Sequence, residues 1–175
     1  MLKILCIVNG YLEENCYIIH NNKNALIIDP GSELSKIIDN INSLKLNVVG
    51  ILITHYHFDH VGVLEDLNKI YKVKIYDYNN IGLCLVSDFK FKIIKNYGHT
   101  LDSVSFYFEK DKIMFTGDFV FKETIGNYDE ENESIMYSSL KEFSKLDKDI
   151  IIYPGHGEKS SIGYELKHNP FLRGI

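Results

Sequence analysis

Three histidines and an aspartate stand within six positions of the segment ILITHYHFDHVG, residues 51–62. An apolar run that ends in Thr54 leads directly into this cluster, and such a pattern is typical of neither a solvated loop nor the interior of a strand or helix. The run predicts a buried strand, so that the polar side chains follow at its carboxyl end. Imidazole and carboxylate groups at this density indicate metal ligands.

The order of the four ligand-type residues favours two neighbouring metal ions over one. His55 and His57 alternate along an extended segment, so both rings can point to the same side. Asp59 and His60 follow at the start of a predicted helix. A single tetrahedral ion cannot take four ligands from six consecutive residues and still bind a substrate. The alternative is a solvent-exposed polar turn, which the position after a buried strand disfavours.

Further histidine and aspartate residues follow other apolar runs, each beside a glycine or at the end of the run. His99 stands in KNYGHT, Asp118 in KIMFTGDF and His156 in IIIYPGHG, and Asp29 ends the run LIID. Loops at the ends of rigid strands are where such groups can converge. We therefore expect these residues to join the cluster at residues 55–60.

Short β-branched runs alternate with helical patterns along the 175 residues. The alternation predicts an α/β fold with two sheets, or one broad mixed sheet, and helices outside. The length and the 45% content of hydrophobic residues favour a single domain, residues 1–175. Strands are predicted at residues 2–8, 16–20, 25–29, 47–53, 73–77, 91–95, 103–108, 112–116 and 149–154. Helices are predicted at residues 32–44, 60–71 and 133–146, with a last one from about residue 160.

The charge pattern makes nucleic acid an unexpected partner. The formal net charge is -5, and lysine and arginine are scattered rather than gathered in a basic stripe. The opening MLKILCIV is too short to span a bilayer, and the acidic LEEN that follows does not fit a signal peptide. We expect a cytoplasmic protein with no membrane partner.

The cysteines and the remaining histidines have no motif around them. Cys6, Cys16 and Cys84 are odd in number and lack C-x-x-C spacing, which favours a reducing compartment over a disulfide framework. We expect each to act as a small packing residue and not as a metal ligand or nucleophile. His20 and His168 have polar neighbours, and we expect both at the surface.

Four motifs together resemble those of the metallo-β-lactamase fold superfamily. They are THYHFDH, GHT, TGD and PGHG, in this order, and the similarity runs from NCYII to the end of the chain. Within the superfamily, LIIDPG, TGDFVF, YPGHG and the ending SSIGYELKHNPFL look most like the short glyoxalase II-like hydrolases, which resemble hydroxyacylglutathione hydrolase. The resemblance implies a four-layer αββα sandwich.

The resemblance also implies a ligand set for two divalent metal ions. Zinc is the expected metal, and iron or manganese would suit the same imidazole and carboxylate ligands. Asp59 and Asp118 are expected to take part in catalysis as well as in metal binding. Asp29 is expected either to order the THYH loop through hydrogen bonds or to cap its own turn. The implied ligands are His55, His57 and His99 for the first ion, Asp59, His60 and His156 for the second, and Asp118 as a bridge between both.

The expected activity is the hydrolysis of small thioesters or esters by a hydroxide that bridges the two ions. The alternatives are an iron-dependent persulfide oxygenase, a diiron redox protein and a non-catalytic metal-binding protein. The chain shows no flavin domain, which disfavours the redox protein, and the complete second ligand set disfavours the non-catalytic one.

Two departures from the glyoxalase II pattern argue against a role specific to glutathione. Asn127 follows Gly126 where a basic residue is common, and the chain ends at Ile175 without a C-terminal helical domain. The acidic stretch at residues 124–134 is interpreted as a solvated connector or a mobile lid.

Overall fold

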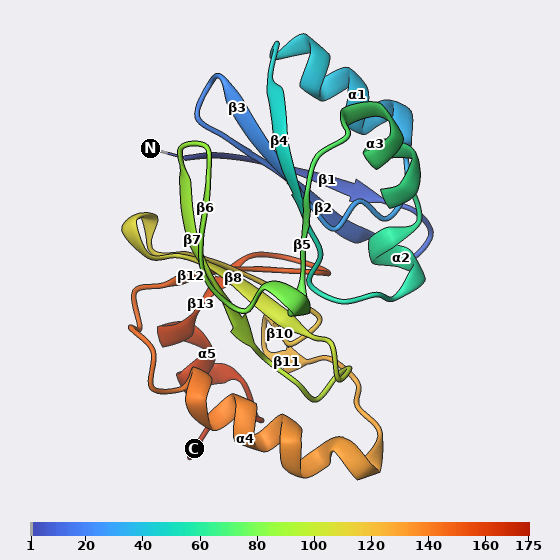
Figure 1. The fold of residues 1–175 in the computed structure, drawn as a ribbon. Coiled ribbons are helices and arrows are strands. Elements are labelled where there is room, and N and C mark those ends of the chain that lie inside the picture. Colours follow the sequence, from blue (N-terminus) through green and yellow to red (C-terminus); the bar gives the residue numbers. More distant parts are fainter. Residues whose placement is uncertain (1) are drawn as a thin grey trace.

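The chain forms two mixed β-sheets packed face to face, and helices cover the outer face of each sheet (Figure 1). A computed structural model describes residues 2–175. The first sheet contains, in spatial order, β1 (Lys3–Asn9), β2 (Glu14–His20), β3 (Asn24–Ile28), β4 (Asn47–Leu52) and β5 (Ile75–Tyr76). Its helices are α1 (Leu34–Ser43), α2 (Phe58–Val61) and α3 (Leu64–Tyr71).

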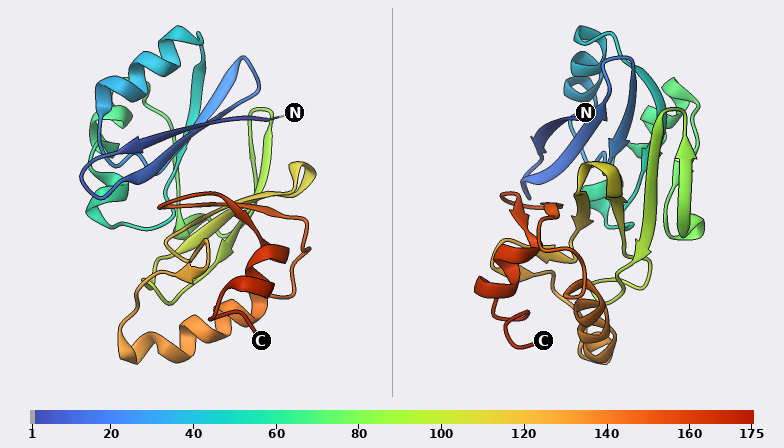
Figure 2. Two further views of the ribbon diagram at one scale, coloured as in Figure 1. Left: turned by 180° about the vertical axis from the view of Figure 1, so that it is seen from behind. Right: turned by 90° about the vertical axis from the view of Figure 1, so that its left-hand side faces the viewer.

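The second sheet comes mainly from the second half of the chain. In spatial order it contains β13 (Ser160–Ser161), β12 (Ile151–Pro154), β9 (Ile113–Gly117), β8 (Val104–Phe108), β7 (Phe89–Lys95) and β6 (Gly82–Val86). Its helices α4 (Glu133–Phe143) and α5 (Ile162–His168) lie on the opposite side of the molecule from α1 and α3 (Figure 2). The remaining elements are the hairpin of β10 (Val120–Phe121) and β11 (Thr124–Ile125) and the short 3₁₀ helices η1 (Tyr78–Asn80), η2 (Glu109–Asp111) and η3 (Glu130–Asn132).

Strand β2 shows why the sandwich has four layers. Successive side chains of a strand point to opposite faces of the sheet. Tyr17 and Ile19 therefore enter the core between the two sheets, whereas Cys16 and Ile18 pack under the helices of the first sheet. A third core cluster, which includes Met114 of β9, lies between the second sheet and its own helices. The predicted αββα sandwich is confirmed.

Several boundaries differ from the sequence-based expectation. The helix expected over residues 60–71 is interrupted at Gly62, where an added Cβ would lie 2.2 Å from the Gly31 carbonyl oxygen. Just after it, the Val63 N–H donates to the Pro30 oxygen instead of to a helical carbonyl. The acidic stretch at residues 124–134 contains β11, η3 and the start of α4.

Strand β6 was not expected, because its sequence GLCLV carries no polar alternation and two of its apolar side chains, Leu83 and Leu85, face solvent. Its pairing with β7 through a tight turn defines it as a strand. The two-residue strands β10, β11 and β13 are too short to leave a periodic pattern.

Two expectations about single residues were wrong. His20 is buried, and its Nδ1 accepts a hydrogen bond from the Asn22 N–H at 3.2 Å. Cys6 is exposed, although Ile4 on the same face of β1 packs against the core between the sheets. Cys16 is buried in the core under the helices, and Cys84 packs partly against the core between the sheets. His168 is exposed, as expected.

Within residues 2–175, none of the helices has both the length and the apolar character needed to cross a membrane.

Candidate metal centre

The ends of five strands deliver the ligand-type residues to one place. Strands β3 and β4 run parallel, as do β9 and β12, and β7 has the same direction as β9 through two antiparallel pairings. The carboxyl ends of parallel strands lie at the same edge of a sheet. The residues that follow these ends are Asp29 after β3, the cluster at 55–60 after β4, His99 after β7, Asp118 after β9 and His156 after β12.

All seven proposed metal-binding residues converge in three overlapping groups, and the candidate ligand atoms in each group lie within 4.8 Å of one another. We call His55, His57 and His99 the three-histidine group, and Asp59, His60 and His156 the mixed group. The remaining combination is His55, His60 and Asp118, which links the two groups. The structure thus brings together the side chains of the two sets that the family resemblance implies.

In the three-histidine group, the ring nitrogens face a common point. His57 Nδ1 lies 3.1 Å from His55 Nε2 and 3.0 Å from His99 Nε2. The other nitrogen of His99, Nδ1, donates to the Asn127 carbonyl oxygen at 2.6 Å. A carbonyl only accepts, so the proton is on Nδ1 and the Nε2 lone pair points into the group.

In the mixed group, the same arrangement recurs. His156 Nε2 lies 3.3 Å from Asp59 Oδ2, and the outer nitrogen of the ring, Nδ1, donates to the Leu12 carbonyl oxygen at 3.0 Å. His60 Nδ1 donates to Asp29 Oδ2 at 3.1 Å, which leaves Nε2 facing inward. Outer hydrogen bonds of this kind fix the tautomer and orientation of metal-binding histidines.

The carboxylate of Asp118 faces both groups. Its Oδ1 lies 3.3 Å from His60 Nε2, and its Oδ2 lies 3.6 Å from His156 Nε2 and 3.7 Å from His99 Nε2. Asp118 Oδ1 and His60 Nε2 are both buried and have no partner with hydrogen-bond geometry among the described residues. Buried polar atoms are almost always paired, and a cation is a partner that both atoms accept. The donor set therefore fits metal ions.

The environment favours the protonation states that metal binding requires at three of the ligands. Burial lowers the pKa of His55 to about 2, and burial together with the neighbouring His99 lowers that of His57, so these rings are neutral. Burial alone would raise the pKa of Asp118, but the facing His60 ring outweighs it and the pKa falls below its ordinary value. Neutral imidazoles and ionised carboxylates are the metal-binding forms. At His60, by contrast, two facing carboxylates outweigh burial and raise the pKa to about 10, so a metal ion would displace a proton from this ring.

Asp29 organises the loop that carries the ligands. Its Oδ1 accepts from the Thr54 N–H at 2.8 Å, and its Oδ2 accepts from the Thr54 hydroxyl at 2.6 Å as well as from His60. The Thr54 oxygen then lies 3.1 Å from His55 Nδ1 and can accept its proton. The expectation that Asp29 orders the THYH loop is confirmed. The turn at Asp29 is closed by backbone atoms, from the Gly31 N–H to the Asp29 oxygen.

Tyr56 anchors the same loop from its outer side, and the sequence pattern did not single it out. The Tyr56 hydroxyl donates to Asp77 Oδ2 at 2.6 Å, and its backbone N–H donates to Asp102 Oδ2 at 3.1 Å. Asp77 follows β5 and Asp102 follows the GHT motif, so two other loops fix the segment between His55 and His57. The residues next to Tyr56 in the sequence do not predict these partners, because both are distant along the chain.

Gly155→Ala is expected to weaken metal binding while the chain still folds. An added Cβ would lie 2.1 Å from Asp118 Oδ1 and 2.7 Å from His60 Cε1, so the methyl group displaces the carboxylate. Overpacking of this kind costs about 1–3 kcal/mol. Metal content measured by plasma mass spectrometry should fall below that of the wild type. Gly82→Ala is the control, because its Cβ meets no atom within 4 Å and Gly82 begins strand β6, outside the ligand-bearing loops. Equal metal loss in both variants would contradict a specific effect at Asp118.

Comparisons with known proteins identify the family. The sequence matches the metallo-β-lactamase superfamily over residues 10–83 and 76–156. It is 33% identical to the hydroxyacylglutathione hydrolase GloC of Haemophilus influenzae, across 91% of this chain and 93% of that protein. It is 30% identical to a probable metallo-hydrolase of Streptococcus pyogenes, across 98% of this chain and 91% of that protein.

Solved structures show the same architecture. The fold is similar to that of BLEG-1, a B3 metallo-β-lactamase, with a TM-score of 0.92 and 26% identity across 99% of this chain and 100% of that one. It is also similar to TTHA1623 in a di-iron-bound form, with a TM-score of 0.86 and 27% identity across 96% and 100% of the two chains. From the motif order, the strand-end geometry and these matches, the chain belongs to the metallo-β-lactamase superfamily of metal-dependent hydrolases.

Proposed function

We propose that the protein is a dinuclear metal-dependent hydrolase of small thioesters. The observation that carries the proposal is the presence of two complete ligand groups with the Asp118 carboxylate between them. The similarity to GloC, which is named as a hydrolase of a glutathione thioester, supports the choice of substrate class. That relative is matched over nearly its whole length, so a chain of this size is compatible with thioester hydrolysis.

We assign one ion to the three-histidine group, one to the mixed group and Asp118 to both. Among the described residues, no cysteine belongs to these groups, so the ligands are imidazole nitrogens and carboxylate oxygens. Such ligands accept zinc, iron or manganese. We propose zinc as the metal, and the di-iron-bound form of TTHA1623 supports iron as the alternative.

Two divalent cations held there would lower the pKa of a bound water toward neutrality and polarise a substrate carbonyl. Asp59 and Asp118 face the interior of the site, so each carboxylate can accept a hydrogen bond from the attacking water and orient it. The net reaction adds water across the C–S bond, with the hydroxyl on the acyl carbon and the proton on sulfur. Asp59 lies near two histidines and Asp118 near three. Asp59 is therefore the proposed group that transfers the proton from the water to the sulfur.

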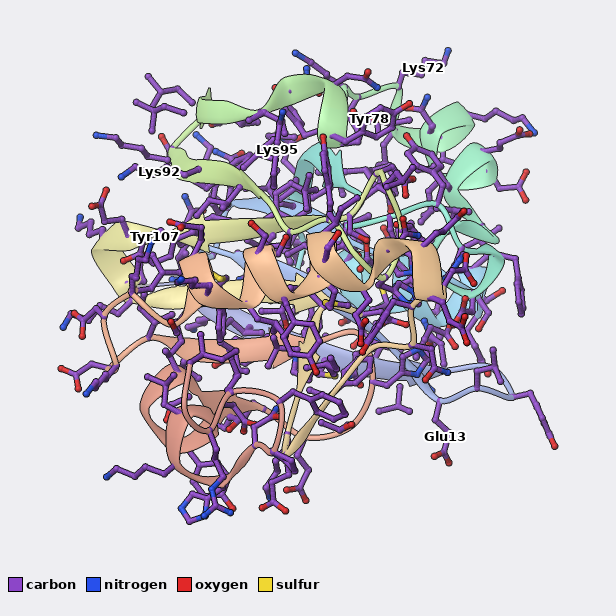
Figure 3. All side chains as sticks on the ribbon, turned by 90° about the horizontal axis from the view of Figure 1, so that it is seen from below. Glu13, Lys72, Tyr78, Lys92, Lys95 and Tyr107 are labelled. Atoms are coloured by element: carbon purple, nitrogen blue, oxygen red, sulfur yellow. The ribbon has the colours of Figure 1, made fainter. Side chains whose placement is uncertain are left out.

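The loops around the site favour substrates with little negative charge. Residues 10–14, 54–60, 97–103 and 123–132 contain no lysine or arginine. Glu13 points outward from the turn between β1 and β2 (Figure 3). Tyr11, Phe58 and Leu101, on the same loops, are 98%, 75% and 62% exposed. These four loops offer an anionic tripeptide thiol no basic partner, and the loop that carries His156 offers only Lys159, whereas an apolar acyl or thiol group would find contact area.

Asn127→Arg is expected to lower the KM for a glutathione thioester by about two- to fivefold, because an exposed ion pair contributes at most about 1 kcal/mol. The change should leave kcat nearly unaltered, since a charge contact remote from the reacting bond adds mainly uniform binding. The Asn127 carbonyl, which holds His99, is unaffected by the new side chain.

Steady-state kinetics on a glutathione thioester and on an uncharged analogue measure this effect. Asn127→Gln is the matched control, and the KM for the uncharged analogue should stay constant in both variants. A wild-type enzyme that saturates at micromolar glutathione thioester and ignores the analogue would contradict the proposed substrate preference.

The proposed function is tested by removing and restoring the metal. Protein stripped with a chelator should release no thiol from either thioester, and protein reloaded with zinc, iron or manganese should hydrolyse both. A fully loaded, folded protein that hydrolyses neither thioester would overturn the thioesterase assignment and leave the metal-binding groups without a catalytic role.

A further inference from the structure

The β1–β2 hairpin of the first sheet forms several hydrogen bonds with the loop of the second sheet that carries His156. The Asn15 backbone N–H donates to the Gly155 oxygen at 2.7 Å. The Asn15 side-chain Nδ2 donates to the Pro154 oxygen at 3.0 Å and to the Gly157 oxygen at 2.9 Å. A single asparagine therefore bonds to the residues on both sides of His156.

Other atoms of the hairpin reinforce this contact. The Tyr17 hydroxyl donates to the same Pro154 oxygen at 2.7 Å. Glu14 and His156 form an isolated antiparallel β-bridge, and the Leu12 oxygen accepts from His156 Nδ1. The position of the His156 ring is thus defined by the hairpin, although His156 follows strand β12 in the sequence.

The environment of Asn15 fixes the orientation of its amide. The residue is buried, and its Nδ2 faces two carbonyl oxygens, which only accept hydrogen bonds. Its Oδ1 accepts the weak bond from Cys6 Sγ at 3.4 Å. A side chain with the same volume but no N–H donors would place an acceptor against two acceptors.

His156 depends on this contact because its side chain is less enclosed than that of His60, the other histidine of the mixed group. Its side chain is 27% exposed, whereas that of His60 is fully buried and packed among its neighbours. The three-histidine group is held by other partners, namely Thr54 for His55 and the Asn127 carbonyl for His99. Among the described contacts, none joins Asn15 to that group.

We propose that Asn15 is a positioning residue that holds His156 and thereby sets the metal affinity of the mixed group alone. This inference rests on the proposed dinuclear function. Loss of the Asn15 amide frees the Pro154–Gly157 loop, and the mixed group then keeps only two well-held ligands. The three-histidine group retains all of its contacts. Loss of a partner that orients a metal ligand typically lowers metal affinity by about 10- to 100-fold.

The test is the metal stoichiometry of Asn15→Ala after equilibrium dialysis against buffered zinc, with folding checked by circular dichroism. The wild type should bind two ions, and the variant should bind one tightly and the other about 10- to 100-fold more weakly. Asn24→Ala is the matched control. Asn24 is also a buried asparagine of the first sheet, and its Nδ2 bonds to Ser87 and Asp88 of the second sheet, away from the site. It should keep both ions.

Asn15→Asp keeps the volume of the side chain and removes the donors, so it tests the inference even where the alanine variant fails to fold. It should lose the same ion. Two tightly bound ions in a folded Asn15→Asp protein would overturn the inference while leaving the dinuclear function intact. A wild type that binds fewer than two ions would instead contradict the function on which the inference rests.

Discussion

Asp118→Ala is expected to give a folded protein with less than its full complement of metal and a loss of at least about a thousandfold in kcat/KM, which equals about 4 kcal/mol. The Asp118 carboxylate is the one described group that lies within 4 Å of histidines from both ligand groups. Its removal takes away a ligand and the charge between the two ions at once. Loss of a ligand to one group should therefore have a smaller effect.

Asp118→Asn separates charge from shape in this experiment. It keeps the size of the side chain and one acceptor oxygen but removes the negative charge, so its metal content should be intermediate. Metal content and thioester hydrolysis are measured on the same preparations. Two ions per chain and full activity in Asp118→Ala would show that this carboxylate is not part of the metal centre.

Asp29→Ala is expected to lower the free energy of unfolding by about 3 kcal/mol and metal affinity by about 10- to 100-fold. The buried carboxylate accepts from the Thr54 N–H, the Thr54 hydroxyl and His60 Nδ1. Without it, buried donors lose their partner, and the ligand-bearing loop loses its anchor. Asp29 also has a φ of 49°, which alanine adopts less readily than aspartate or asparagine.

Asp29→Asn is the control for the backbone, because asparagine tolerates positive φ. Its oxygen can still accept from Thr54, but its NH₂ group meets donors, so only part of the loss should be recovered. Chemical denaturation of the metal-free protein gives the stability change, and metal titration gives the affinity change. A stable Asp29→Ala protein with wild-type metal affinity would contradict the ordering role.

The sequence was most informative where chemistry is local. His55, His57, Asp59 and His60 are close in the chain, and their convergence follows from a strand that ends at a polar loop. The alternation of short β-branched runs with helical patterns likewise predicted sheets with helices on the outside. Such patterns depend on neighbours within a few positions, and the predicted αββα fold was confirmed.

Features that depend on residues distant in the sequence could not be predicted in this way. Strand β6 is defined by its pairing with β7, and the burial of His20 depends on the packing around the end of β2. Asn15 appears in the sequence only as a polar residue before an apolar run, yet its partners lie some 140 positions later. Long-range hydrogen bonds of this kind require the tertiary structure.

The central claim is that two metal ions share this site, and anomalous diffraction from crystals of the metal-loaded protein tests it most directly. We expect two peaks, one beside the three-histidine group and one beside the mixed group, with the Asp118 carboxylate in contact with both. A single peak, or peaks remote from these side chains in a protein shown to be fully loaded, would contradict the dinuclear assignment.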